Sequence, residues 1–271
     1  KIEGKITQQT PVSIATLDSG IDLDHEDLNI NIDREHCVYV HPYDEPSKPE
    51  NPDDEIIYPY STYTTEQLPD GHGTSVASVI AATSNNGTGV AGVAAGTSND
   101  LVRLMGINVF DGYSRQGSAT TVDIIKGLHY ACAKGARVIN MALGHTWNES
   151  VKLDKDSDVK HQHNDALLQE EINNATEDDD VVFVATAGNK GNQQGWYPSD
   201  FDNVISVINT QKYNDAWSQD CKFSSSSYGP QKDLSAPGNN ILKATFNGKN
   251  TYSNGNGTSM AAPHVAAVAA M

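Results

Sequence analysis

Three residues, Asp18, His72 and Ser259, carry the side chains that hydrolysis through a serine nucleophile requires. A serine hydroxyl becomes an effective nucleophile when a base takes its proton, and a histidine serves as that base when a carboxylate fixes its tautomer. Ser259 follows a Gly-Asn-Gly-Thr turn and opens an alanine-rich run that predicts a buried helix. A serine at a helix start is also a common capping residue. Residue type therefore permits a catalytic triad without requiring one.

The elements that would position these residues follow from the apolar segments of the sequence. Five apolar, partly β-branched segments predict strands at 11–17, 101–110, 136–143, 181–187 and 203–208. Helices are predicted after His72, at 120–134, at 164–176 and from Ser259 to the chain end. The alternation indicates an α/β fold, a three-layer doubly wound sandwich around a mostly parallel sheet. Ligands bind beyond the carboxyl ends of such strands, where Asp18, residues 142–144 and Asn189 fall.

The composition narrows the class of protein. Among 271 residues, 35 acidic side chains outnumber 18 basic ones, and the formal charge of −17 disfavours nucleic acid and anionic membranes as partners. No apolar run reaches the roughly 18 residues that a membrane span needs. The cysteines are an odd number at no metal-like spacing, Cys37, Cys132 and Cys221, so at most one internal disulfide is possible and free thiols are the default expectation. We expect a single, monomeric domain over residues 1–271.

Several motifs give the three reactive residues a specific context. In chain order, the sequence resembles the active-site signatures of the subtilisin-like serine proteases at Asp18-Ser19-Gly20-Ile21-Asp22, at His72-Gly73-Thr74-Ser75-Val76-Ala77 and at Gly257-Thr258-Ser259-Met260-Ala261-Ala262-Pro263-His264-Val265-Ala266. It also resembles the oxyanion segment and the substrate-binding strand of that family at Ala187-Gly188-Asn189 and at Asn140-Met141-Ala142-Leu143-Gly144.

The resemblance implies a serine endopeptidase that works through an acyl-enzyme. Ser259 would be the nucleophile, His72 the general base and acid, and Asp18 the carboxylate that orients the histidine. Asn189 would donate its side-chain amide to the oxyanion, together with the backbone N–H of Ser259. His264 follows Ser259 closely in the sequence, but the resemblance assigns the role of base to His72.

The same resemblance implies how a polypeptide substrate binds. The substrate would lie as an extended strand between two segments, Gly112-Tyr113-Ser114 and Ala142-Leu143-Gly144. The far wall of the pocket for the residue before the cleaved bond would be Ala187-Gly188-Asn189.

The floor and rim of that pocket bear on substrate preference. Trp196 stands where the family usually has a small residue at the pocket floor. It either packs in the core or fills the pocket, and in the second case it favours small substrate side chains. The wall segments contain no acidic residue, which argues against cleavage after lysine or arginine, and Lys190 at the rim would favour an acidic residue.

Calcium is the cofactor that the resemblance implies. The family binds it through the carboxylate nine residues after the catalytic aspartate, here Asp27. Further oxygen ligands come from the loop after the histidine helix, here Asn86 and the backbone carbonyls of Thr88 and Val90. The N-terminal ligand of the family has no counterpart, because 17 residues precede Asp18.

Two polar segments, 41–55 and 146–163, are predicted as surface loops. The second contains His161 and His163, which either bind a transition metal or, as we favour, are simply exposed. The Tyr197–Pro198 bond aligns with one that is often cis in the family.

The sequence departs from the family pattern at both ends. It stops 12 residues after Ser259, inside a helix that further segments of the family domain normally cover, and its N-terminal segment is short. We therefore expect a catalytic domain truncated at both ends. The family also implies an inhibitory propeptide as a partner and a secreted location.

Two alternatives to a hydrolysing endopeptidase stay open. One is a specialised processing peptidase or transpeptidase, in which segment 146–163 caps the site. The other is a pseudoprotease that acts as a binding module. The pseudoprotease hypothesis predicts damage to the triad or to the oxyanion donor, and all four of those residues are intact.

Overall fold

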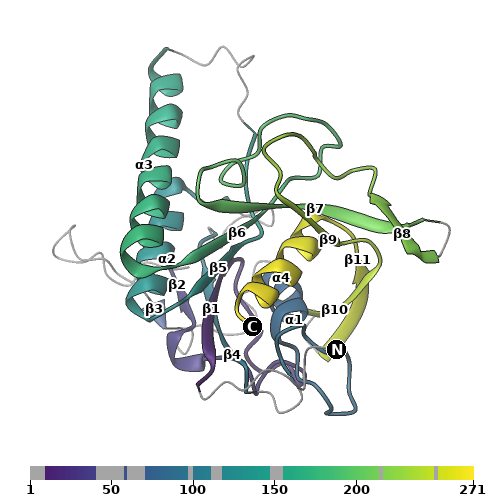
Figure 1. Ribbon diagram of the computed structural model, residues 1–271. Helices are drawn as coiled ribbons and strands as arrows, with labels where there is room; N and C mark the ends of the chain where they lie inside the picture. Colours follow the sequence, from purple (N-terminus) through teal and green to yellow (C-terminus); the bar gives the residue numbers. More distant parts are fainter. Residues whose placement is uncertain are drawn as a thin grey trace.

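A β-sheet runs through the centre of the structure and separates two pairs of helices (Figure 1). The structure is a computed structural model that describes residues 10–40, 58–59, 71–96, 100–110, 118–146, 155–213, 216–246 and 250–271. Within these ranges, nine strands form the sheet in the order β3-β2-β4-β1-β5-β6-β7-β8, with β9 paired to β7. Their bounds are β1 (Val12–Asp18), β2 (Val38–Tyr39), β3 (Tyr58–Pro59), β4 (Val102–Asn108), β5 (Val138–Met141), β6 (Val182–Thr186), β7 (Val204–Tyr213), β8 (Ala216–Lys222) and β9 (Leu234–Pro237).

Most neighbouring strands are parallel, as the sequence predicts. β1 pairs in parallel with β4 and β5, and the parallel arrangement continues through β6, β7 and β9. β3 and β8 are antiparallel to their neighbours β2 and β7. The register sets Asp18 opposite Asn108, so the carboxyl ends of the two central strands lie level.

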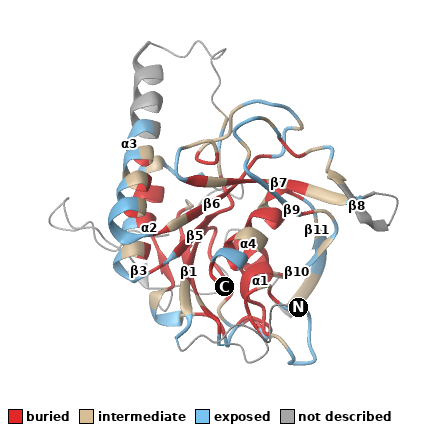
Figure 2. Ribbon diagram, viewed as in Figure 1, coloured by how far each residue is buried: buried red, intermediate tan, exposed pale blue. Residues whose placement is uncertain are grey.

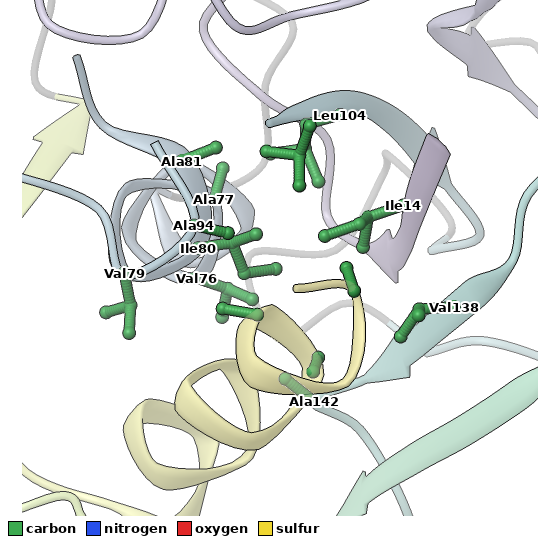
Figure 3. Packing of buried hydrophobic residues seen from close by; sticks show 14 of the residues in the cluster. Ile14, Val76, Ala77, Val79, Ile80, Ala81, Ala94, Leu104, Val138 and Ala142 are labelled. Atoms are coloured by element: carbon green, nitrogen blue, oxygen red, sulfur yellow. The ribbon is translucent and has the colours of Figure 1, made fainter. Parts of the chain in front are cut away.

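Two helices cover each face of the sheet, which confirms the three-layer architecture. α1 (His72–Ala81) and α4 (Thr258–Ala269) lie on one face, and α2 (Thr121–Ala133) and α3 (Lys155–Asp179) lie on the other (Figure 1). Neighbouring residues of β1 pack on opposite faces of the sheet. Ile14 packs in the cluster beneath α1 and α4, whereas Ala15 and Leu17 pack in the cluster beneath α2 and α3. Figure 3 shows part of the first cluster, where Ile80 of α1 extends toward the sheet residues Ile14 and Leu104.

The helices α1 and α4 are the more deeply buried pair. All residues of α1 from Gly73 to Ala81 are buried, and Figure 2 shows this helix almost entirely in red. The inner face of α4 is buried through its small side chains, including Ala262 and Ala266, while Val268 on its outer face is 61% exposed. The prediction of a buried alanine-rich helix is therefore right for one face of α4.

The prediction of a surface loop over 146–163 is wrong from Lys155 onward. α3 begins at that residue and continues to Asp179. Leu168, Ile172 and Ala175 pack one stripe of the helix against the sheet, spaced four and three residues apart. Once such a helix is anchored, extending it by further turns through polar residues requires no apolar pattern, because propagation is much cheaper than nucleation. The predicted loop at 41–55 lies outside the described residues.

A β-hairpin precedes α4 and was not predicted. β10 (Ile241–Phe246) and β11 (Asn250–Gly255) pair antiparallel, and β10 packs against α1. Ser75 Oγ of α1 donates to the carbonyl of Ala244 at 2.9 Å, and the Ala244 N–H donates to Ser78 Oγ at 3.0 Å. β11 is rich in Thr, Ser and Asn, and Lys243 and Thr245 interrupt the apolar residues of β10, so neither strand is an apolar segment of the kind that predicts the central parallel strands.

Two expectations from composition can be compared with the described residues. The three cysteines are free, as expected. No helix in the described part of the chain is long and apolar enough to cross a membrane.

Candidate active site

The aspartate and the histidine meet at the carboxyl edge of the sheet. Asp18 is the last residue of β1 and His72 is the first residue of α1. His72 Nδ1 lies 2.8 Å from Oδ1 and 3.1 Å from Oδ2 of Asp18. The Asp18 side chain is 1% exposed, whereas that of His72 is 37% exposed. A buried carboxylate at Nδ1 favours the tautomer with the proton on that nitrogen, so Nε2 is the atom that can accept a proton.

Glycine allows α1 to begin this close to β1. A Cβ placed on Gly73 would lie 2.1 Å from the carbonyl oxygen of Gly20, so no side chain fits there. Two further bonds fix the contact: Gly73 N–H donates to Ser19 Oγ at 3.1 Å, and Asp22 N–H donates to Thr74 Oγ1 at 2.9 Å. The glycine after His72 is therefore required by the approach of the helix to the β1 turn.

The serine lies at the start of α4. Gly257, with φ of 148°, is the N-cap, and Ser259 is the second residue of the helix. The hydroxyl of Ser259 donates a long hydrogen bond of 3.4 Å to the carbonyl of Ala142. A residue in the first turn of a helix has a backbone N–H without a helical acceptor, which suits stabilisation of negative charge.

Asn189 is held by the residue that precedes the serine. Its Oδ1 accepts from the Thr258 N–H at 2.9 Å and from Thr258 Oγ1 at 3.1 Å. Because a backbone N–H can only donate, the amide oxygen must face Thr258, and the NH₂ group must face elsewhere. The buried hydroxyl of Thr186 donates to Thr258 Oγ1 and extends the chain of bonds. The amide of Asn189 is therefore oriented as a donor for a third partner.

A cavity of about 410 Å³ adjoins these residues. Ser259, Asn189 and the predicted residues Ala142, Leu143, Gly144 and Trp196 line it. The lining that the sequence did not predict includes residues just after β4, on α2 and α3, and in the segment after Trp196: Phe110, Ile124, Leu168, Tyr197 and Phe201. These residues are scattered over about 90 positions of the sequence and form no motif, so no local signal marks them. No charged side chain is among the described lining residues.

The other predicted substrate residues have different outcomes. Ala187 is fully buried and does not line the cavity. Gly188 lies behind Trp196, because a Cβ on it would be 2.6 Å from Cδ2 of the indole. Gly112, Tyr113 and Ser114 lie outside the described residues. Lys190 is exposed and is not part of the lining.

Trp196 occupies the space between the two pocket walls. A Cβ on Gly144 would be 2.3 Å from the indole Nε1, so the ring packs on the Cα atoms of Gly144 and Gly188 together. Both glycines have positive φ, 155° and 91°. The Tyr197–Pro198 bond that follows is cis, as predicted. The two alternatives for Trp196 therefore combine: it is packed between the walls and it also lines the cavity.

His264 lies on α4, away from the role of base. Its Nδ1 donates to the carbonyl of Met260 at 2.8 Å, and burial lowers the pKa of its imidazole below the usual value. A half-buried histidine that is bonded within its own helix suits packing, which agrees with the assignment of the base to His72.

The predicted calcium ligands lie together, but their orientation does not fit the ion. Asp27 is fully buried, and its two oxygens accept from Asn86 Nδ2 at 2.6 Å and from the Val90 N–H at 2.7 Å. The side-chain oxygen of Asn86 accepts from the Thr88 N–H at 3.1 Å. The side-chain oxygens of Asp27 and Asn86 already accept hydrogen bonds, and the N–H groups that donate them would repel a cation. Calcium remains an untested prediction that this arrangement does not support.

No other metal centre is formed by the described side chains. They contain no group of three or more His, Cys, Asp or Glu residues that could hold a metal ion. His161 and His163 fall within α3, in a part whose side chains lie outside the described residues. The transition-metal hypothesis for these two residues therefore stays untested.

Comparison with known proteins assigns this chain to a family. The family model described as the subtilase family matches residues 9–271. The chain therefore belongs to the subtilase family.

Individual relatives agree with that assignment. Thermitase from Thermoactinomyces vulgaris is 34% identical over 208 residues, which cover 77% of this chain and 63% of that protein. A thermophilic serine proteinase from Bacillus sp. (strain AK1) is 33% identical over 95% of this chain and 51% of its own length. Subtilisin Savinase from Lederbergia lenta is 34% identical over 96% of this chain and 75% of its own length. The chain thus spans between half and two thirds of the first two relatives.

A solved structure supports the fold. The protease domain of PatA, in its S218A mutant form, matches 98% of this chain and 81% of its own chain with a TM-score of 0.66. The sequence identity is 21%, so this likeness concerns the fold alone.

Proposed function

We propose that this chain is the catalytic domain of a serine endopeptidase that hydrolyses polypeptides through an acyl-enzyme on Ser259. The observation that carries the proposal is the bond between the buried Asp18 carboxylate and His72 Nδ1, at 2.8 Å. Membership of a family whose relatives include serine proteases supports it. The intact set of Asp18, His72, Asn189 and Ser259 argues against a pseudoprotease.

The acylation half of the reaction uses three side chains. Ser259 Oγ forms a bond to the carbonyl carbon of the scissile peptide while its proton passes to His72 Nε2. Asp18, bonded to Nδ1, stabilises the positive charge that develops on the imidazole. The imidazolium then donates its proton to the leaving nitrogen, the C–N bond breaks, and the amine product departs.

The developing oxyanion is stabilised by two donors. One is Asn189 Nδ2, whose direction is fixed because Thr258 binds the amide oxygen at 2.9 Å. The other is the backbone N–H of Ser259, which lies in the first turn of α4. Donors fixed before the reaction need not reorganise as charge appears, so they favour the transition state over the bound substrate.

Deacylation reverses these roles. Water attacks the ester carbon and gives a proton to His72 Nε2, and the histidine returns a proton to Ser259 Oγ as the acid product leaves. The substrate would lie as an extended strand beside Ala142-Leu143-Gly144, with the side chain before the cleaved bond entering the cavity next to Ser259.

Product masses test this proposal against a transpeptidase. The protein is incubated with a peptide of known sequence in the presence of a second peptide amine. Hydrolysis adds one water across the cleaved bond, whereas transpeptidation gives ligated or cyclic products. We expect hydrolysed products that disappear with Ser259→Ala. Products that persist in Ser259→Ala would contradict the assignment.

We also infer, from the family, that the protein acts outside the cytoplasm and that an inhibitory propeptide is a partner. Recovery of the activity from the culture medium of the source cells tests the first inference. Activity confined to the cell lysate would contradict it.

A further inference from the structure

A buried ion pair lies directly behind the pocket that Trp196 closes. Asp200 and Lys232 are bonded to each other, and their side chains are only 6% and 4% exposed. We propose that this pair positions Trp196 and thereby restricts the substrate residue before the cleaved bond to a small side chain. This inference rests on the proposed peptidase function, because it concerns the pocket next to Ser259.

Asp200 holds both backbone groups of Trp196. The Trp196 N–H donates to Oδ2 of Asp200 at 3.0 Å, and the Asp200 N–H donates to the carbonyl of Trp196 at 2.9 Å. These reciprocal bonds fix the backbone from which the indole projects. The other carboxylate oxygen of Asp200, Oδ1, is the one that pairs with Lys232.

Lys232 reaches Asp200 from a segment that is itself fixed to the sheet. The next residue, Asp233, exchanges two bonds with Ser206 of β7: its carboxylate accepts from the Ser206 N–H at 2.8 Å, and its own N–H donates to the Ser206 carbonyl at 3.0 Å. The ammonium of Lys232 is therefore presented from a rigid element. Such a partner orients a buried carboxylate, and removal of one member of the pair leaves an uncompensated charge.

The position of the indole ring depends on these backbone bonds between Trp196 and Asp200. Among the described residues, Trp196 Nε1 is buried and has no hydrogen-bond partner. Packing against Gly144 and Gly188 and the placement of its backbone therefore determine where the ring lies. Without the bonds to Asp200, we expect the ring to leave the space between the two walls part of the time. The pocket would then be deeper.

The test measures selectivity for the residue before the cleaved bond. Two peptides that differ only by alanine or phenylalanine at that residue are compared, and the ratio of their kcat/KM values is taken. In Asp200→Ala/Lys232→Met, which removes both charges and the acceptor, we expect the ratio to shift toward phenylalanine by about tenfold or more, the size of effect that pocket shape commonly has on selectivity. Trp196→Gly, which removes the ring, should shift it further.

Two control variants separate positioning from general destabilisation. Asp200→Asn/Lys232→Met also removes both charges but keeps an acceptor for the Trp196 N–H, so it should shift the ratio less than the variant with alanine. Val102→Ala trims a fully buried residue at the start of β4, and it should lower stability while leaving the ratio unchanged. A change equal to that of Asp200→Ala/Lys232→Met in Val102→Ala would overturn the proposal.

A second measurement does not depend on activity. The chain has three tryptophans, and the contribution of Trp196 to the fluorescence is obtained by subtracting the spectrum of Trp196→Phe in each background. Acrylamide should quench this contribution more strongly in Asp200→Ala/Lys232→Met than in the parent protein.

The outcomes distinguish the proposed role of the ion pair from the proposed peptidase function. Unchanged quenching in that folded variant would overturn the role of the pair, whether or not peptides are cleaved. An unchanged ratio in an active variant, or in Trp196→Gly, would overturn it as well. If quenching differs between the variant and the parent as expected but the folded parent protein cleaves no peptide, the proposed peptidase function is refuted. The role of the ion pair in positioning Trp196 would still stand.

Discussion

The two faces of the sheet contribute different kinds of residues to the candidate site. On one face, α1 and α4 are packed by small residues, and each carries a reactive side chain in its first turn, His72 and Ser259. On the other face, α2 and α3 each leave a large apolar side chain about half exposed, Val122 and Leu167, and they contribute apolar side chains to the cavity. In the proposed mechanism, the base and the nucleophile therefore come from the more buried pair of helices, and part of the cavity lining comes from the more exposed pair.

This difference has a physical reason. A nucleophile and a base must be held to within fractions of an ångström, and helices that are buried on several sides have few alternative positions. Helix starts also present free N–H groups toward developing negative charge. Apolar contacts with a substrate are less directional, so they can come from surface helices that tolerate variation.

Asn189→Ala should have the largest effect among the predictions that separate chemistry from binding. Loss of its amide donor should lower kcat by about 10² to 10³, the value that is known for the equivalent donor in subtilisin, while KM changes little. Steady-state kinetics on a single peptide measure both constants. A rise in KM with unchanged kcat would place Asn189 in substrate binding.

Ile80→Ala and Val122→Ala compare the two helix pairs by stability. Ile80 is fully buried on α1, so its truncation should lower the free energy of unfolding by about 2–5 kcal/mol. Val122 on α2 is 51% exposed, and its truncation should change that free energy by less than about 0.5 kcal/mol. Denaturant titrations measure both values. Equal effects would remove the distinction between the faces.

Leu168→Ala tests whether the second face binds the substrate. Leu168 of α3 is 3% exposed and lines the cavity. Its truncation should raise KM by about tenfold with little change in kcat, because it removes binding that the ground state and the transition state share. Ile172→Ala, four residues further along the same helix, is the control. It should destabilise the fold without this change in KM.

Calcium should have little effect on stability if the loop after α1 is held by N–H donors. The Asp27 carboxylate is already bonded by Asn86 and Val90, so the melting temperature in excess EDTA should lie within about 2 °C of that in calcium. Differential scanning calorimetry measures both. A calcium-dependent rise well beyond that range would show that these residues reorient to bind the ion.

The smallest expected effect is the loss of folding stability that His264 causes on acidification. Burial lowers the pKa of this side chain in the folded state, so the unfolded chain takes up the proton first as the pH falls below about 6.5. The stability that the neutral side chain contributes is therefore present above that pH and is lost as the pH falls toward the folded pKa. Unfolding titrations between pH 8 and 5 should show a shallower loss in His264→Gln than in the parent. An equally steep loss in His264→Gln and in the parent would contradict this role of His264.

The sequence predicts those parts of the fold and site that local pattern or motif determines. The alternation of apolar segments predicts the parallel sheet, and β1 ends at Asp18, one residue beyond the predicted end. The capping box of α2, formed by Thr120 and Asp123, marks a helix start within one residue of the prediction. The motifs around His72 and Ser259 place both residues at helix starts, as observed.

Features set by distant contacts could not be predicted. β11 is polar, and β10 is held by bonds to α1 from residues more than 160 positions away. The cavity lining is assembled from several elements, and the Asp200–Lys232 pair joins residues 32 apart. The orientation of the N–H donors around Asp27 depends on backbone turns that the residue types alone do not determine.

Covalent labelling of Ser259 tests the central claim most directly. A fluorophosphonate reacts with a serine hydroxyl that a neighbouring base activates, and peptide mass spectrometry locates the adduct. We predict a single adduct on Ser259 in the folded protein and its loss in Ser259→Ala and in His72→Ala. A folded protein that gives no adduct, or an adduct that survives in His72→Ala at an unchanged rate, would contradict the account.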